Sequence, residues 1–190
     1  MKVFIAGARA ISTLEEPVEN RLRGLYNKNY SVLVGDANGV DVAVQRYFSK
    51  LNYSNVTVYA SNGKARNNIG NWQVETVSVP SNIKGFDFYA VKDKAMADNA
   101  DYGFMIWNGE SRGTLNNIIN LLNDNKKSLV YFTPDKILTQ IDNFKDLEKM
   151  LNSCNDDAQK LYKKLRCKQK ANNTVVQMSL FEINNDIVNL

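Results

Sequence analysis

Short apolar runs alternate with amphipathic stretches along this chain, and that alternation limits its fold more than any other feature. Runs typical of buried strands occupy residues 2–7, 30–35, 55–60, 102–107 and 128–132. Stretches with helical periodicity occupy residues 12–26, 40–51 and 114–124. Strands separated by helices favour a parallel sheet with right-handed crossovers. We therefore predict an α/β fold, a Rossmann-like parallel sheet flanked by helices over residues 1–133, with a C-terminal helical extension and tail over residues 134–190.

The composition excludes several classes of active site. The 190 residues include no histidine, which rules out a Ser-His-Asp or Cys-His centre and imidazole-ligated zinc. Any catalysis would have to use carboxylates, Lys, Tyr, Ser, Thr or a carboxylate-bound metal. We expect no metal site and no cofactor.

The hydropathy pattern predicts a cytoplasmic protein with no membrane partner. No apolar run approaches the roughly 18–20 residues of a membrane span. The apolar part of residues 1–10 is also much shorter than a signal peptide. Hydrophobic residues make up 44% of the chain, which is enough for a core, and the net charge of +4 is compatible with an anionic partner.

Three glycine-containing turns follow predicted strands: GAR at residues 7–9, GDANGVD at 35–41 and GESRGT at 109–114. In open parallel sheets, ligands bind beyond the carboxyl ends of the strands, where helix N-termini offer free N–H groups. One such turn is usually only a turn, but three at one edge indicate a pocket for an anion. The dinucleotide fingerprint G-x-G-x-x-G is absent after the first strand, which disfavours an NAD or FAD dehydrogenase.

Together with KDKAMADNAD at residues 92–101, these turns resemble the SLOG superfamily over residues 1–133. This group of Rossmann-like proteins includes the DNA-processing protein DprA, the LOG phosphoribohydrolases and nucleotide sensors of the YspA kind. The spacing G-x-A-x-G-V-D at residues 35–41 is similar to the DprA and YspA pattern. The resemblance is therefore strongest to the YspA-like branch of bacterial proteins.

The resemblance implies that the chain binds a nucleotide or a nucleotide-derived phosphorylated ligand at the carboxyl edge of the sheet. The residues that match the family's motifs, or lie within them, are Gly7, Arg9, Gly35, Asp36, Gly39, Asp41, Lys92, Asp93, Gly109, Ser111, Arg112, Gly113 and Thr114. Asp36 and Asp41 have a second interpretation, because Asp beside Gly commonly orders a turn. Lys92 and Asp93 could instead lie on a solvated helix surface.

One departure from the LOG motif bears on catalysis. LOG enzymes carry P-G-G-x-G-T-x-x-E, whose glutamate acts at the glycosidic bond, and this chain has Asn117 at the glutamate position. An amide cannot act as a carboxylate general acid or base. A nucleotide N-glycosidase is therefore an alternative, with Glu110, Asp93 and Asp41 as its candidate catalytic carboxylates. A DNA-transaction accessory protein related to DprA is a second alternative.

The polar stretch at residues 61–85 is predicted to be a long loop, and loops of this length are often functional. Lys64, Arg66 and Trp72 could reach over the pocket as a basic and stacking lid, or they could be ordinary surface residues.

The composition shifts after residue 133. Two amphipathic helices are expected, at residues 143–152 and 155–171, and QMSLF follows at residues 177–181. This pentapeptide resembles the motif that binds the bacterial sliding clamp, in which Gln177, Met178, Leu180 and Phe181 would contact the partner. The same segment could instead be an edge strand that closes the sheet or pairs with a second subunit in a homo-oligomer.

Overall fold

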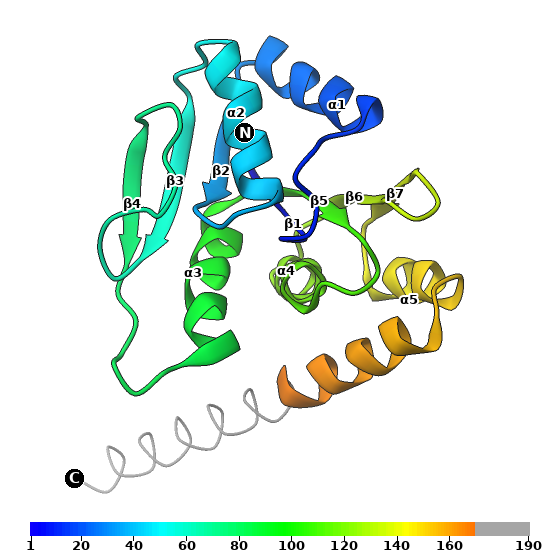
Figure 1. Cartoon of the computed structure of the whole chain (residues 1–190). Coiled ribbons are helices and arrows are strands. Elements are labelled where there is room, and N and C mark those ends of the chain that lie inside the picture. Colours follow the sequence, from blue (N-terminus) through cyan, green and yellow to red (C-terminus); the bar gives the residue numbers. More distant parts are fainter. Residues whose placement is uncertain (170–190) are drawn as a thin grey trace, which may run out of the picture.

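The computed structural model describes residues 1–169, which are built around a single sheet (Figure 1). Its strands are β1 (Lys2–Gly7), β2 (Ser31–Gly35), β3 (Val56–Ser61), β4 (Gln73–Val77), β5 (Tyr102–Trp107), β6 (Ser128–Phe132) and β7 (Ile137–Ile141). Their order across the sheet is β4-β3-β2-β1-β5-β6-β7. All neighbouring strands pair in parallel except β6 and β7, which form an antiparallel pair. The predicted α/β, Rossmann-like parallel sheet is confirmed.

Helices cover both faces of the sheet (Figure 1). They are α1 (Glu16–Asn27), α2 (Val40–Lys50), α3 (Gly85–Asn99), α4 (Arg112–Asn123) and α5 (Phe144–Asn152). Residues 156–169 are also helical. Side chains from α1 and α2 share one hydrophobic core, and side chains from α3, α4 and α5 share the other. Because successive strand residues point to opposite faces, Val3 and Ile5 of β1 enter the first core and Phe4 enters the second.

The chain order creates a switch point in the centre of the sheet. From β1 the chain adds β2, β3 and β4 outward on one side, and α3 then returns it to β5 on the other side of β1. At such a point the crossovers on either side diverge, which leaves a crevice beyond the carboxyl ends of the central strands. This position brings together the turns that follow β1, β2 and β5.

Two strands were not predicted, because neither has the apolar run of a buried strand. β4 lies at one edge of the sheet and its QVETV sequence is largely exposed, so the interpretation of residues 61–85 as a continuous loop is wrong at residues 73–77. β7 lies at the other edge, within the region expected to be a helical extension, and only Ile141 of its five residues is fully buried.

The candidate clamp-binding residues lie outside the described residues; they are Gln177, Met178, Leu180 and Phe181.

Within residues 1–169, no helix combines the length and the apolar character that crossing a membrane requires.

Candidate functional site

A cavity of about 500 Å³, here called the central pocket, lies at the switch point beyond β1, β2 and β5. Its walls are the three glycine-containing turns and one face of α3. The residues predicted from the sequence that line it are Gly7, Arg9, Asp41, Lys92, Asp93, Glu110, Ser111, Gly113 and Thr114. The structure thus brings residues from all three turns, and from α3, to one cavity.

Five of the predicted ligand-binding residues do not line the pocket: Gly35, Asp36, Gly39, Gly109 and Arg112. Gly39 has a positive φ of 83°, and a Cβ at this position would overlap the backbone of Arg9. Its glycine therefore allows the turn after β2 to pack directly against the turn after β1. Gly35 lies where a side chain would overlap Asp41. These glycines shape the wall behind the pocket.

The turn between β5 and α4 is ordered by its own side chains. Asn108 Oδ1 accepts hydrogen bonds from the N–H groups of Glu110, at 3.2 Å, and Ser111, at 3.0 Å. Ser111 is the N-cap of α4, and its Oγ accepts from the Thr114 N–H at 3.4 Å and from Thr114 Oγ1 at 2.9 Å. Within residues 1–169, the N–H groups of Arg112 and Gly113 have no hydrogen-bond acceptor. Free N–H groups in the first turn of a helix are suited to bind an anion.

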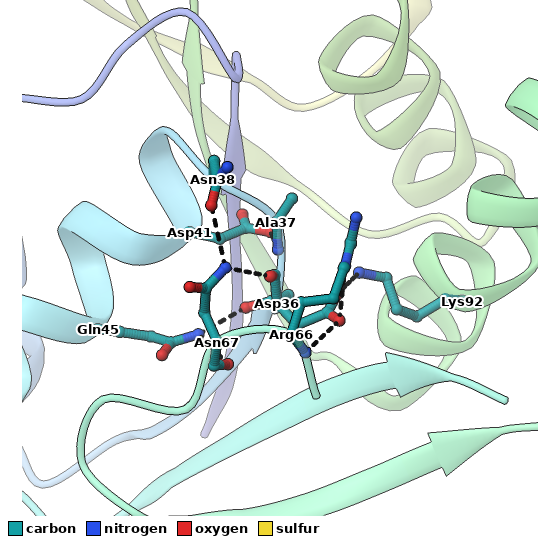
Figure 2. Close-up of polar contacts among 9 residues, drawn as sticks. Asp36, Ala37, Asn38, Asp41, Gln45, Arg66, Asn67 and Lys92 are labelled. Carbon is teal, nitrogen blue, oxygen red and sulfur yellow. Dashed lines mark hydrogen bonds and ion pairs between the residues drawn. The ribbon is translucent and has the colours of Figure 1, made fainter. Parts of the chain in front are cut away.

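A buried ionic cluster lies beside the pocket, centred on Asp36 (Figure 2). Lys92 Nζ lies 2.8 Å from Asp36 Oδ1, and both side chains are almost fully buried. Arg66 Nη2 donates to Asp36 Oδ1 at 2.7 Å and Arg66 Nε donates to Asp36 Oδ2 at 3.0 Å. Burial alone would raise the pKa of Asp36, but the Arg66 hydrogen bonds and the Lys92 charge hold it well below its usual range. Asp36 is therefore a fixed anion that orients two cations.

Asp41 and Asp93, two of the acidic residues that line the pocket, have pKa values shifted in the opposite direction from that of Asp36. Burial raises the pKa of Asp41 to about 7, against the opposing charge of Lys92. Burial also raises the pKa of Asp93 to about 6, although Lys92, a hydrogen bond with Asn117 and Arg9 all favour its ionised form. Asp41 Oδ2 accepts a hydrogen bond from the Ala37 N–H at 3.0 Å, so Asp41 also orders its turn. Both groups can exchange a proton near neutral pH.

The segment that carries Arg66 is fixed to the turn after β2. Gln45 of α2 is fully buried, and its amide donates to the carbonyl oxygens of Gly35, at 2.9 Å, and Asn67, at 3.2 Å. Asn67 Nδ2 in turn donates to the Asp36 carbonyl oxygen at 2.8 Å (Figure 2). Gln45 could not be identified from the sequence, because an amide on an amphipathic helix is usually solvated.

None of the three candidates for a lid, Lys64, Arg66 and Trp72, lines the central pocket. Arg66 comes nearest in role, because it binds Asp36 in the ionic cluster beside the pocket. Trp72 packs at a different place, where its Nε1 donates to the Tyr53 carbonyl oxygen at 2.7 Å. The interpretation of Trp72 as a stacking residue over the pocket is therefore wrong.

Aromatic residues of α3, which sequence reasoning missed, form another wall of the pocket. The Arg9 guanidinium lies 4.7 Å from the centre of the Tyr89 ring, and that of Arg66 lies 5.2 Å from it. The Arg112 guanidinium lies 3.7 Å from the centre of the Phe86 ring. Because residues three or four apart share a helix face, the spacing from Lys92 back to Tyr89 and Phe86 was the signal that could have identified them.

Comparison with known proteins establishes the fold. No known family model matches the sequence, and no curated protein sequence matches it. Among solved structures, the chain is similar to DNA processing protein A from Helicobacter pylori, which was described for its unique single-stranded DNA binding mode. The TM-score is 0.55 with 13% sequence identity, over 88% of this chain and 81% of that chain. The chain therefore has a DprA-like fold.

Proposed function

We propose that the central pocket binds a nucleotide through its phosphate group. The observation that carries this proposal is the convergence of phosphate-binding and base-binding groups in one cavity. The free N–H groups at the start of α4 and the Arg9 guanidinium suit a phosphate. The rings of Phe86 and Tyr89 suit a stacked base. Burial raises the pKa of Asp41 to about 7, so this carboxyl is protonated part of the time near neutral pH, which reduces its repulsion of an anion.

The test uses substitutions that fill or alter the start of α4. A Cβ at Gly113 would meet no neighbouring atom within 4 Å, so Gly113→Val should project into the pocket without a clash. Thr114→Val removes the hydroxyl that donates to Ser111. Each change should weaken the binding of nucleoside monophosphates by at least about tenfold, since one charge-assisted hydrogen bond contributes roughly 1.5–3 kcal/mol.

The matched control is Gly24→Val on α1. A Cβ at Gly24 also meets nothing within 4 Å, and Gly24 does not line the pocket. Calorimetry should show unchanged affinity for this variant, and the unphosphorylated nucleoside should bind the unmodified chain much more weakly than the monophosphate. The proposal is refuted if both pocket variants bind nucleoside monophosphates as tightly as the control and the unmodified chain do.

A second candidate is single-stranded DNA as the ligand, of which the pocket would hold one nucleotide unit. The observation in its favour is the DprA-like fold, because the Helicobacter pylori protein binds single-stranded DNA. Fluorescence anisotropy with a labelled oligothymidylate tests it. In that case, Gly113→Val should weaken the binding of the oligonucleotide and of the mononucleotide together. If the pocket binds only free nucleotides, the chain should show no oligonucleotide binding.

A further inference from the structure

A second cavity, of about 360 Å³, lies between α1 and α2 and is here called the basic groove. Its charged lining comprises Arg23 from α1, Arg46 and Lys50 from α2, and a single carboxylate, Glu19. Within residues 1–169, none of the three cations has a carboxylate partner at ion-pair distance. The groove therefore presents excess positive charge to solvent.

Neutral hydrogen-bonding groups complete the lining of the basic groove. Ser12 and Thr13 contribute exposed hydroxyl-bearing side chains from the loop that follows β1. Tyr47 also lines the groove, and its hydroxyl is buried without a hydrogen-bond partner among the described residues. Cations combined with hydroxyl groups are the donors that proteins use for phosphate oxygens.

The basic groove and the central pocket are neighbours, separated by one loop and sharing one helix. In the loop after β1, residues 8–10 line the central pocket and residues 12–14 line the groove. On α2, Asp41 lines the central pocket, and Arg46 and Lys50 line the groove. At 1.5 Å and about 100° per residue, these two cations lie about 8 and 14 Å along the helix axis from Asp41 and on the opposite side of the helix. An extended ligand that reaches both cavities must therefore follow the loop after β1 around the start of α2.

We propose that the basic groove binds the phosphodiester backbone of single-stranded DNA whose neighbouring nucleotide occupies the central pocket. This inference rests on the proposed function and specifies its ligand class, since a free mononucleotide would gain nothing from a second phosphate subsite. The groove contacts the backbone and no base edge, so its contribution is independent of base sequence. Its two α2 cations should also make the affinity dependent on salt.

The experiment compares two double variants that lose the same charges. Arg46→Ala with Lys50→Ala removes the α2 cations of the groove. Arg21→Ala with Lys28→Ala removes one Arg from α1 and the Lys that caps its C-terminus, both outside the two cavities. Anisotropy with labelled oligothymidylate and calorimetry with thymidine monophosphate are measured on the full chain at several salt concentrations.

The groove variant should bind oligothymidylate at least about tenfold more weakly while its affinity for the mononucleotide is unchanged. Its slope of log affinity against log salt should become shallower by about 1.4, or about 0.7 for each lost phosphate contact to a single strand. The control variant should match the unmodified chain in both assays.

Several outcomes would overturn the inference. The inference fails if the groove variant binds the oligonucleotide as tightly as the unmodified chain does. It also fails if the control variant loses as much oligonucleotide affinity as the groove variant, because that result indicates unspecific attraction between charges. Mononucleotide binding without oligonucleotide binding would overturn the inference and leave the proposed function intact. Oligonucleotide binding that depends on the groove and is indifferent to Gly113→Val would also overturn the inference, because the strand would then not occupy the central pocket. The proposed function would still be decided by the mononucleotide measurements alone.

Discussion

Lys92 Nζ lies 2.8 Å from Asp36 Oδ1, and only 3% and 4% of the two side chains are exposed. Removing two charges from water carries a large desolvation penalty, which their mutual attraction offsets only while both partners are present. The pair joins α3 to the turn after β2, so it holds one wall of the central pocket against another. Its position beside the pocket links the stability of the fold to the geometry of the site.

Lys92→Met should lower the free energy of unfolding by about 3 kcal/mol, the low end of the range for a broken buried ion pair. The low end is expected because Arg66 still contacts Asp36 in the variant. Urea denaturation measures the change. Lys94→Met is the control on the same helix, since Lys94 forms only partly exposed pairs with Asp98 and Asp124 and should contribute less than about 1 kcal/mol. The prediction is contradicted if Lys92→Met lowers the free energy of unfolding by no more than this control does.

The stability of the fold should fall as the pH rises from about 4 to about 7. Asp41 has a pKa of about 7 in the folded chain and an ordinary value of 3.8, so the folded state retains a proton that the unfolded state has released. Stability from this proton is fully present below the ordinary pKa and is lost as the pH rises through the folded pKa. Asp93, with a pKa of about 6, acts in the same direction.

Denaturant unfolding at several pH values checks this dependence. Asp41→Asn keeps an oxygen acceptor for the Ala37 N–H and removes the titration, so its stability should decline less over this range than that of the unmodified chain. Asp36 has the opposite shift and contributes stability that is lost only as the pH falls below its ordinary range. An unchanged pH profile in Asp41→Asn would show that this carboxyl does not carry the effect.

Tyr89→Ala should weaken nucleotide binding, if the ring stacks on the base, by about 1–3 kcal/mol. Tyr89→Phe keeps the ring and should retain most of the affinity. Ribose 5-phosphate has no base, so its affinity should be the same for all three proteins. A parallel loss of ribose 5-phosphate binding in Tyr89→Ala would mean that Tyr89 acts by positioning Arg9, which lies against its ring.

Release of free base from nucleoside monophosphates should be far below an ordinary turnover of about 1 per second. Asn117 lines the pocket and supplies an amide where the resemblance to LOG enzymes requires a carboxylate. Chromatography of reaction mixtures measures the release. A turnover of that order would overturn the prediction, and loss of such activity in Asp93→Asn would then identify the carboxyl beside Asn117 as the catalytic group.

The five central strands were predictable because each is buried on both faces. Such strands must be nearly continuous apolar runs, as Val3, Phe4 and Ile5 illustrate. β4 and β7 were missed because an edge strand is half-exposed and needs no such run. The glycine-containing turns were found for a related reason, since positions such as Gly39 permit close packing that no other residue allows.

The features that can be recognised in the sequence are therefore local: the positions at which apolar runs become turns, and the fact that these turns follow parallel strands. The packing of distant segments directs Asp36 toward Lys92 and Arg66, whereas Asp41, five residues later, lines the pocket. It also decided that Phe86 and Tyr89 of α3 face the turns after β1 and β5. The physical reason is that the ionisation of a carboxyl and the contacts of a ring depend on neighbours distant in the chain, which only the packing of α3 across the sheet brings within reach.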